Sequence, residues 1–281
     1  MTAKTDLFAT SRCLVAEGPR WNAAERALYW VDVTAGHVYV KAEGTEPDAF
    51  EMFDPKVGKI GALSFVGRRR LLLFANECKV WDYELGGTPK LLHALPDHGA
   101  TRFNDVFTDG IRHYCGVAPR ADDPTRRGEL WMMDGKGTFT CVEPATQGMP
   151  NGMGLSPGRT TFYFVVTDER RVYAYDYDRA DGTVRNRRVL CETEGEGLPD
   201  GMDVAPDGTL WIAFWNGGRL EHHAADGSLL GSVAFPMPKV TSVASLVDRM
   251  YVTTANLDSD PDVLFDRTGA GSVFTIRFEG E

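Results

Sequence analysis

Six β-rich runs recur along this chain of 281 residues, and their spacing limits the possible folds more than any other feature. Their starts lie roughly 40 to 50 residues apart, which is the length of one four-stranded β-propeller blade. Each run is followed by a second β-like run, with Gly, Asp or Asn in the connection, as a β-hairpin requires. The six runs are LYWVDV from Leu28, LLLFAN from Leu71, HYCGVA from His113, TFYFVVTD from Thr161, LWIAFWN from Leu210 and MYVTTAN from Met250.

No helical periodicity competes with this pattern, and no Pro- or Ser-rich linker interrupts it. Closing the blades into a ring would protect the sheet edges. The sequence therefore predicts an all-β protein, a six-bladed β-propeller with four-stranded antiparallel blades around a central channel, in which residues 1–281 form a single domain. Polar residues at the ends of five runs are expected to form turns: Asp32, Asn76, Asp168, Asn216 and Asn256.

The charge balance excludes some partners. The formal net charge is −10, which disfavours nucleic acid and anionic membranes. No apolar run approaches the ~18 residues needed to span a membrane, and the N-terminal stretch lacks the apolar segment of a signal peptide. The five cysteines include no CxxC pair, which is typical of reduced, buried or half-buried thiols. We therefore expect a cytoplasmic monomer or weak homo-oligomer.

One phase of the repeat, about ten residues before each run, has an amide or carboxylate side chain at four of its six equivalent positions. In a propeller, equivalent positions of different blades form a ring around the axis. Carboxylates and amides gathered there repel one another unless a cation lies between them, and hard divalent cations prefer such oxygen ligands. The alternative is that Asn or Asp before Gly simply forms a turn. The six positions are Glu17, Ile60, Asn104, Asn151, Asp200 and Thr241.

Four motifs span nearly the whole chain: AEGPRW from Ala16, RFNDV from Arg102, NGMGLSPG from Asn151 and LPDGMDVAPDGTLWIAFWNGGR from Leu198. In this order and spacing they resemble the family of senescence marker protein (regucalcin), gluconolactonase and luciferin-regenerating enzyme. The resemblance implies a six-bladed propeller that holds one divalent metal ion. It also implies hydrolysis of sugar lactones, with some relatives cleaving compounds like phosphotriesters.

The resemblance further assigns roles to individual residues. It implies that Glu17, Asn151 and Asp200 bind the metal, and that Arg102 and Asn104 contact the substrate or reach the metal through water. A carboxylate can act as ligand and base, so Asp200 is the candidate that takes a proton from the attacking water. The ion is expected to be Ca, Zn, Mg, Mn or Fe, and the substrate a small lactone.

Several alternatives stay open at this stage. The chain can instead be a phosphotriesterase-like hydrolase or a non-catalytic calcium-binding propeller, and Arg102 can be part of a structural ion pair. The stretch after Gly116 departs from the family, and Asp122 or Asp123 is the candidate for its sugar-holding acid. The loops 119–127 and 256–269 are candidate caps over the channel. The six histidines fall outside the ring, and the His222–His223 pair is interpreted as a surface or half-buried pair in an outer strand.

Overall fold

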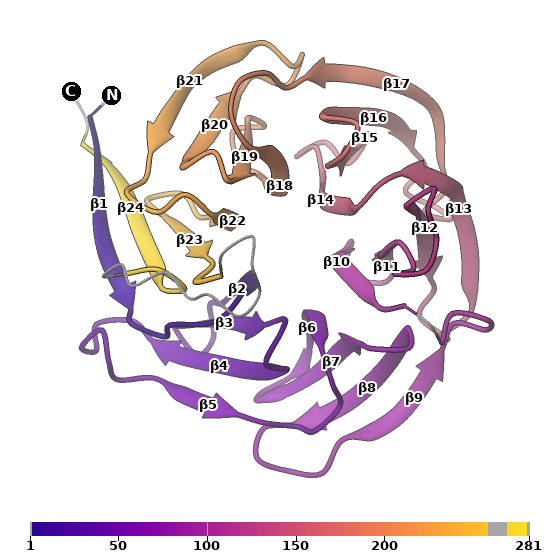
Figure 1. The fold of residues 1–281 in the computed structure, drawn as a ribbon, viewed down its shortest axis with the longest axis horizontal. Coiled ribbons are helices and arrows are strands. Elements are labelled where there is room, and N and C mark those ends of the chain that lie inside the picture. The colour runs from indigo at the N-terminus through magenta and orange to yellow at the C-terminus, as the bar shows by residue number, and fades with distance from the viewer. Residues whose placement is uncertain (1, 100, 258–268, 280–281) are drawn as a thin grey trace.

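Six four-stranded antiparallel sheets are arranged in a ring in the computed structural model of this chain (Figure 1). The structure describes residues 2–99, 101–257 and 269–279. All of the regular elements in these ranges are strands. In the same ranges, no helical segment has the length and apolarity that crossing a bilayer requires.

Five sheets run in chain order from the centre of the ring to the rim, and in the sixth β22 is innermost and β1 is outermost (Figure 1). The innermost strands are β2 (Ala16–Asn22), β6 (Ile60–Gly67), β10 (Phe103–Thr108), β14 (Pro150–Leu155), β18 (Leu198–Val204) and β22 (Val240–Ser245). The second strands are β3 (Ala27–Asp32), β7 (Arg70–Ala75), β11 (His113–Val117), β15 (Thr161–Val166), β19 (Leu210–Trp215) and β23 (Met250–Thr254).

The outer half of each blade has two further strands. The third strands are β4 (His37–Ala42), β8 (Lys79–Glu84), β12 (Arg127–Met133), β16 (Arg171–Tyr177), β20 (Arg219–His223) and β24 (Val273–Glu279). The outermost strands are β5 (Glu51–Phe53), β9 (Lys90–Ala94), β13 (Phe139–Gln147), β17 (Val184–Glu192), β21 (Leu229–Ala234) and β1 (Thr2–Ala9). The predicted six-bladed propeller is therefore confirmed, and the six runs found in the sequence are the second strands.

The core lies in the six seams between neighbouring blades. Each seam holds one cluster of buried apolar side chains from the blades on its two sides. The second strands lie between two neighbouring blades, so both of their faces are covered and every residue of β3 and β23 is buried. A strand buried on both faces needs a continuous apolar run, which is why these strands stand out in the sequence.

The N-terminal strand closes the ring. β1 pairs antiparallel with β24 and forms the outer strand of the last blade, whose order is β1-β24-β23-β22. One sheet thus joins the two ends of the chain (Figure 1). The closure covers the edge of β24 that would otherwise be free to pair with another chain.

Every innermost strand has an irregularity in its pairing at the same place. The register between first and second strands shifts at Glu17/Arg20, Ile60/Ala62, Phe103/Val106, Pro150/Met153, Pro199/Met202 and Val240/Ser242. A bulge sets two residues against one and re-aims a side chain. The repeated bulge explains why side chains at and beside the ring positions do not alternate between the two faces of the sheet as in a regular strand.

The two Asn-Gly and Asp-Gly pairs at ring positions lie within these strands, so the alternative that these two pairs form turns is wrong. Asn151-Gly152 belongs to β14 and Asp200-Gly201 to β18. A Cβ on Gly152 would overlap the backbone nitrogen of Met202 in the next blade, and one on Gly201 would overlap the side chain of Ser242. Glycine is needed here because the inner strands of adjacent blades nearly touch.

We expect Gly152→Ala to lower the free energy of unfolding by about 1–3 kcal/mol, because the added methyl group must push two inner strands apart. Gly231→Ala is the matched control, since Gly231 lies in the outermost strand β21 and a Cβ there meets nothing within 4 Å. The control should change stability by less than about 0.5 kcal/mol. Chemical denaturation followed by Trp fluorescence measures both, and equal effects would contradict this account of the inner strands.

Candidate functional site

A cavity of about 300 Å³ lies at the end of the channel where the inner strands begin. It is lined by Val15, Glu17, Val33, Thr34, Lys59, Arg102, Asn104, Arg126, Met149, Asn151, Thr167, Asp168, Leu198, Asp200 and Trp215. The structure therefore brings all five predicted site residues, namely Glu17, Arg102, Asn104, Asn151 and Asp200, to one cavity.

The other two ring positions have structural roles. Ile60 is fully buried in the apolar cluster between the first two blades. The Thr241 hydroxyl donates to the carbonyl oxygen of Ala16, 2.6 Å away, and lies 2.8 Å from the Thr253 hydroxyl. The ring predicted from the repeat thus exists, and its four members with amide or carboxylate groups are the ones that line the cavity.

A chain of hydrogen bonds orients the amides of the cavity across three blades. Arg102 Nη1 donates to Asn104 Oδ1 over 2.7 Å, and Asn104 Nδ2 donates to Asn151 Oδ1 over 2.8 Å. Asn151 Nδ2 then donates to the Thr167 hydroxyl over 2.8 Å, and this hydroxyl donates to the Pro199 carbonyl oxygen at the same distance. These hydrogen bonds are satisfied by only one orientation of the Asn104 amide and one of the Asn151 amide. The arrangement is therefore set before any ligand binds.

The carboxylates of Glu17 and Asp200 are buried close to one another. Their residues are only 9% and 7% exposed. Burial and the charges of Asp200 and Asp105 raise the pKa of Glu17 well above its usual range, against a hydrogen bond from the Gly18 N–H. Burial and the charge of Asp105 likewise raise the pKa of Asp200 well above its usual range. Both shifts mean that the site lacks sufficient positive charge of its own.

Arg102 is the cation of this cluster. Burial lowers the pKa of Arg102, although the charges of Glu17 and Asp200 favour its protonated form. Its Nη1 group donates to the carbonyl oxygen of Phe103, 2.9 Å away, and to Asn104. The guanidinium therefore lies near the carboxylates, while its Nη1 group donates to the neutral oxygens of Phe103 and Asn104.

The donor set fits a hard divalent cation. Glu17, Asn151 and Asp200 offer carboxylate and amide oxygens to one cavity, and an added positive charge would relieve the repulsion that helps to raise the two carboxyl pKa values. Within the part of the chain that the structure describes, no group of three or more His, Cys, Asp or Glu side chains is placed to hold an ion. A site here would depend on the amide oxygen of Asn151 beside only two carboxylates.

Sequence reasoning missed Asp105, the third buried carboxylate of the cluster. Burial raises its pKa against the charges of Arg20 and Arg102. Asp105 follows Asn104, and a regular strand would direct the two side chains to opposite faces. The bulge at Phe103/Val106 sets both residues against Gly116 alone. The RFND motif contains the residue, but nothing in the sequence marks the bulge.

Sequence reasoning also missed the wall and rim of the cavity. Trp215 ends the run LWIAFW, and its indole ring adds an aromatic surface to the wall. Asp168, predicted only as a turn residue, lines the cavity and accepts a hydrogen bond from the Met149 N–H over 2.8 Å. Arg126 lies 3.6 Å from the Asp168 carboxylate and also lines the cavity.

The two predicted capping loops have different outcomes. Loop 119–127 reaches the cavity through Arg126, whereas neither Asp122 nor Asp123 lines it. Asp123 instead accepts hydrogen bonds from the N–H and hydroxyl of Thr125 within its own turn. In loop 256–269, residues 258–268 lie outside the described residues.

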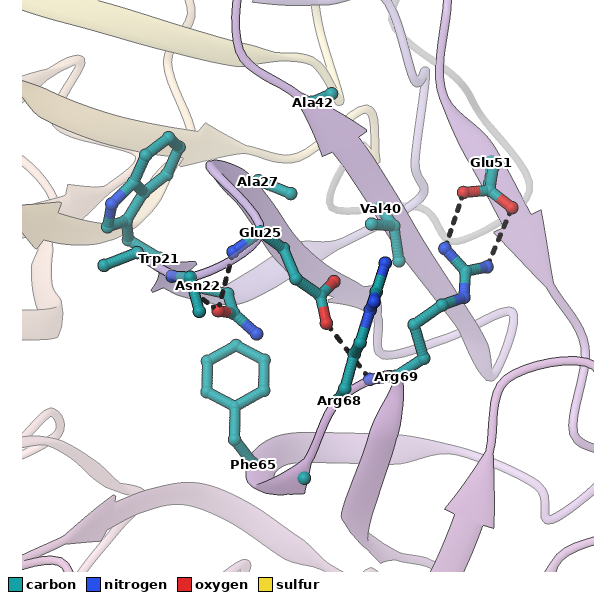
Figure 2. A pocket seen from close by; sticks show the side chains of 13 residues that line it. Trp21, Asn22, Glu25, Ala27, Val40, Ala42, Glu51, Phe65, Arg68 and Arg69 are labelled. Carbon is teal, nitrogen blue, oxygen red and sulfur yellow. Dashed lines mark hydrogen bonds and ion pairs between the residues drawn. The ribbon is translucent and has the colours of Figure 1, made fainter.

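A second cavity, of about 890 Å³, lies at the opposite end of the first blades (Figure 2). It is formed by the turns after β2 and β6 and contains none of the predicted site residues. Its charged groups are largely paired, since Arg69 donates to both oxygens of Glu51 over 2.9 Å and its backbone N–H donates to Glu25 over 3.2 Å (Figure 2). The chemistry predicted from the sequence therefore lies in the smaller cavity.

Comparison with known proteins agrees with the fold. Residues 15–256 match the family model described as SMP-30/Gluconolactonase/LRE-like region. Pentonolactonase XacC of Haloferax volcanii is 37% identical over 262 residues, covering 88% of this chain and 84% of that protein. L-arabinolactonase of Azospirillum brasilense is 30% identical over 277 residues, covering 96% and 91%.

The fold is also shared with solved structures. A luciferin-regenerating enzyme superposes with a TM-score of 0.87 at 23% identity, covering 99% of this chain and 96% of that one. Together with the family model and the two lactonases, this similarity spans the blades that carry all the cavity residues of the inner strands. The chain belongs to the SMP-30/gluconolactonase/LRE-like family.

Proposed function

We propose that this protein hydrolyses a small sugar lactone to the corresponding acid with the help of one divalent cation. The observation that carries the proposal is the meeting of two buried carboxylates, two oriented amides and one guanidinium in a single cavity. Two relatives that match nearly the whole chain are named for the lactones of five-carbon sugars. A cavity of about 300 Å³ is at the small end of ligand pockets and suits a lactone of one sugar unit.

Glu17, Asn151 and Asp200 would hold the cation. When bound, such an ion polarises the carbonyl oxygen of the lactone and makes its carbon more electrophilic. An oxygen-only donor set favours calcium, magnesium or manganese over the softer choices zinc and iron. Thr167 supports the ligand Asn151, because its hydroxyl fixes the amide nitrogen and so directs the amide oxygen.

Asp200 acts as the base that takes a proton from the attacking water. It must be ionised to do so, yet burial and the charge of Asp105 raise its pKa. The charge of Arg102 and a hydrogen bond from Asn151 oppose this rise, since both lower the pKa of Asp200. These two neighbours therefore favour the carboxylate form that accepts the proton.

Arg102, Asn104 and Trp215 bind the sugar. The guanidinium has five N–H donors, and Nη1 alone makes the two protein hydrogen bonds, which leaves donors for substrate hydroxyls. Asn104 is held between Arg102 and Asn151 and orients the substrate. The Trp215 ring offers an apolar surface to the C–H face of a sugar ring.

The whole chain of residues 1–281 works as one domain in this proposal. The strand β1 closes the blade that contains β22, and β22 packs beside β2, which carries Glu17. Both ends of the chain therefore contribute to the position of a cavity residue.

Asp200→Asn should abolish most of the hydrolysis of aldonolactones, because the amide cannot accept the proton and weakens the cation site. A fall in kcat of roughly 10²- to 10⁴-fold is expected. Acid release measured in a pH-stat on a panel of pentono- and hexonolactones, with each divalent cation added, checks this. Glu51→Gln, in the remote cavity, is the matched control and should keep full activity.

The same panel separates the alternatives. Stoichiometric cation binding without turnover of any lactone would favour a non-catalytic calcium-binding propeller. Turnover of an aryl dialkyl phosphate in place of lactones would favour a phosphotriesterase-like hydrolase.

Cation binding itself should stabilise the fold. A cation at 100 times its dissociation constant adds about 2.7 kcal/mol to the free energy of unfolding. Thermal melting of chelated protein, with and without added calcium, magnesium or manganese, measures the effect. Glu17→Gln should remove most of it, and an equal gain in wild type and variant would place the ion elsewhere.

Arg102→Lys should lower kcat/KM for the best lactone by about tenfold or more, because an ammonium cannot reproduce the planar fork of donors. Cation binding should change little, since Arg102 is not a ligand. Arg69→Lys on the far face is the matched control. If Arg102→Lys chiefly lowered the melting temperature and left kcat/KM unchanged, the role of Arg102 would be structural.

A further inference from the structure

A third cavity, of about 400 Å³, lies between the second and third blades at the end of the channel where the inner strands end. This seam cavity is formed by the ends of β6 and β10, by β9, and by the turns 109–112 and 134–138 that follow β10 and β12. None of its lining residues lines the cavity that contains Glu17 and Asp200. It is therefore a separate place for a ligand.

Exposed apolar side chains gather at the mouth of the seam cavity. Val66, Leu92 and Ile111 are 51%, 45% and 65% exposed, and all three line it. They are three of the nine exposed large apolar side chains in the described part of the chain. The buried side chains of Leu72 and Met133 continue the apolar wall inward. Exposed apolar surface concentrated at one cavity indicates a binding site.

One cation lies in this cavity with hydrogen-bond donors to spare. Arg20 belongs to β2, and its Nη2 group donates to the carbonyl oxygen of Val106 over 2.6 Å, so the side chain reaches from the first blade to the third. Burial raises the pKa values of Asp105 and Asp203, and the charge of Arg20 opposes both rises. Among the described residues, however, no carboxylate forms an ion pair or a hydrogen bond with Arg20. Most of its five N–H donors are therefore available to a ligand.

The other polar side chains of the seam cavity add no permanent positive charge. His113 Nε2 lies 3.0 Å from the Ser64 hydroxyl, and burial lowers the pKa of His113 to about 4, so the ring is neutral at pH 7. Asp134 Oδ1 accepts two backbone N–H groups of its own turn, each over 2.8 Å. Among the lining residues, Arg20 is thus the one permanent cation.

Other reactive side chains are less suited to a ligand. His223 is 4% exposed, so it is a buried residue and not the surface or half-buried histidine predicted from the sequence. Its Nε2 lies 3.0 Å from a Glu221 carboxylate oxygen, and its Nδ1 lies 3.0 Å from the Gly227 carbonyl oxygen, so both ring nitrogens are occupied. Cys141 is exposed, contrary to the prediction that the thiols are buried or half-buried, but it lies in the outermost strand β13.

We propose that the seam cavity binds a small monocarboxylate with a short apolar chain. The planar guanidinium of Arg20 matches a carboxylate, which can accept two of its N–H donors side by side. The apolar chain packs against Val66, Leu92 and Ile111 and removes their surface from water. A cavity of about 400 Å³ suits an acid of roughly six to ten carbon atoms. A doubly charged phosphate would leave one negative charge unmatched among apolar side chains.

The test uses hexanoate as the probe and does not depend on lactone hydrolysis. Dissociation constants are measured at pH 7 from the shifts of backbone amide signals in NMR spectra. Hexanoate should shift the signals of Gly110, Ile111 and Gly135 most, and should bind at least about tenfold more tightly than 1-hexanol or hexylammonium. Equal binding of the three compounds, or hexanoate shifts confined to other parts of the fold, would overturn the proposal.

Two variants separate the charge from the apolar contact. Arg20→Gln should weaken hexanoate binding by about tenfold and leave 1-hexanol binding unchanged, because only the acid uses the guanidinium. Ile111→Glu should weaken hexanoate binding by at least about fivefold, because it removes apolar contact and repels the carboxylate. Leu229→Glu, at a side chain that is 60% exposed in the outermost strand β21, is the matched control and should change nothing.

The variants also give the results that would contradict the site. An equal loss of hexanoate affinity in Ile111→Glu and Leu229→Glu would show that binding follows overall charge and not the seam cavity. A full preference for hexanoate over 1-hexanol in folded Arg20→Gln would remove the role of Arg20. If Arg20→Gln fails to fold, Ile111→Glu and the comparison of the three compounds on the wild type still decide.

Discussion

The repulsion between Glu17 and Asp200 is the interaction on which the site depends. Both carboxylates are buried, and burial together with neighbouring negative charge raises the pKa of each. A flexible chain would relax by moving the groups apart or into water. Here they stay together because each is part of a strand that is fixed on both sides by neighbouring blades. The fold thus keeps two like charges close together, and a divalent cation would relieve their repulsion.

Three features of the inner strands make that arrangement possible. The bulge aims ring side chains into the channel, the following glycine lets adjacent inner strands approach, and the pairing of β1 with β24 keeps the circle closed. The apolar seams supply the stabilisation that offsets the buried charge, since each seam is filled by side chains from two blades. Without any one of these features, the positions of Glu17 and Asp200 relative to one another would be less tightly fixed.

The repeat was sufficient to predict the second and third strands, the six blades and the ring, because buried strands need apolar runs and equivalent positions meet at the axis. The outermost strands were harder to predict. In β9 and β21 most side chains are exposed, so hydrophobic alternation places little constraint on their sequence. The closure by β1 depends on pairing between residues more than 260 positions apart, such as Lys4 with Arg277, which leaves no local pattern. Asp105 escaped prediction because the bulge overrides the alternation that would turn it away from Asn104.

The site divides into a part set by strands and a part set by connections. Glu17, Asn104, Asn151 and Asp200 lie in inner strands, where closure of the ring leaves their backbone little freedom. Arg126 and Asp168 lie in connections, and Arg126 adopts a left-handed backbone conformation with φ of 49°. Connections tolerate changes in length and composition that strands do not. In the proposed mechanism, the chemistry of bond cleavage would therefore follow from the fold itself, whereas the choice among lactones would depend on the residues at the rim of the cavity.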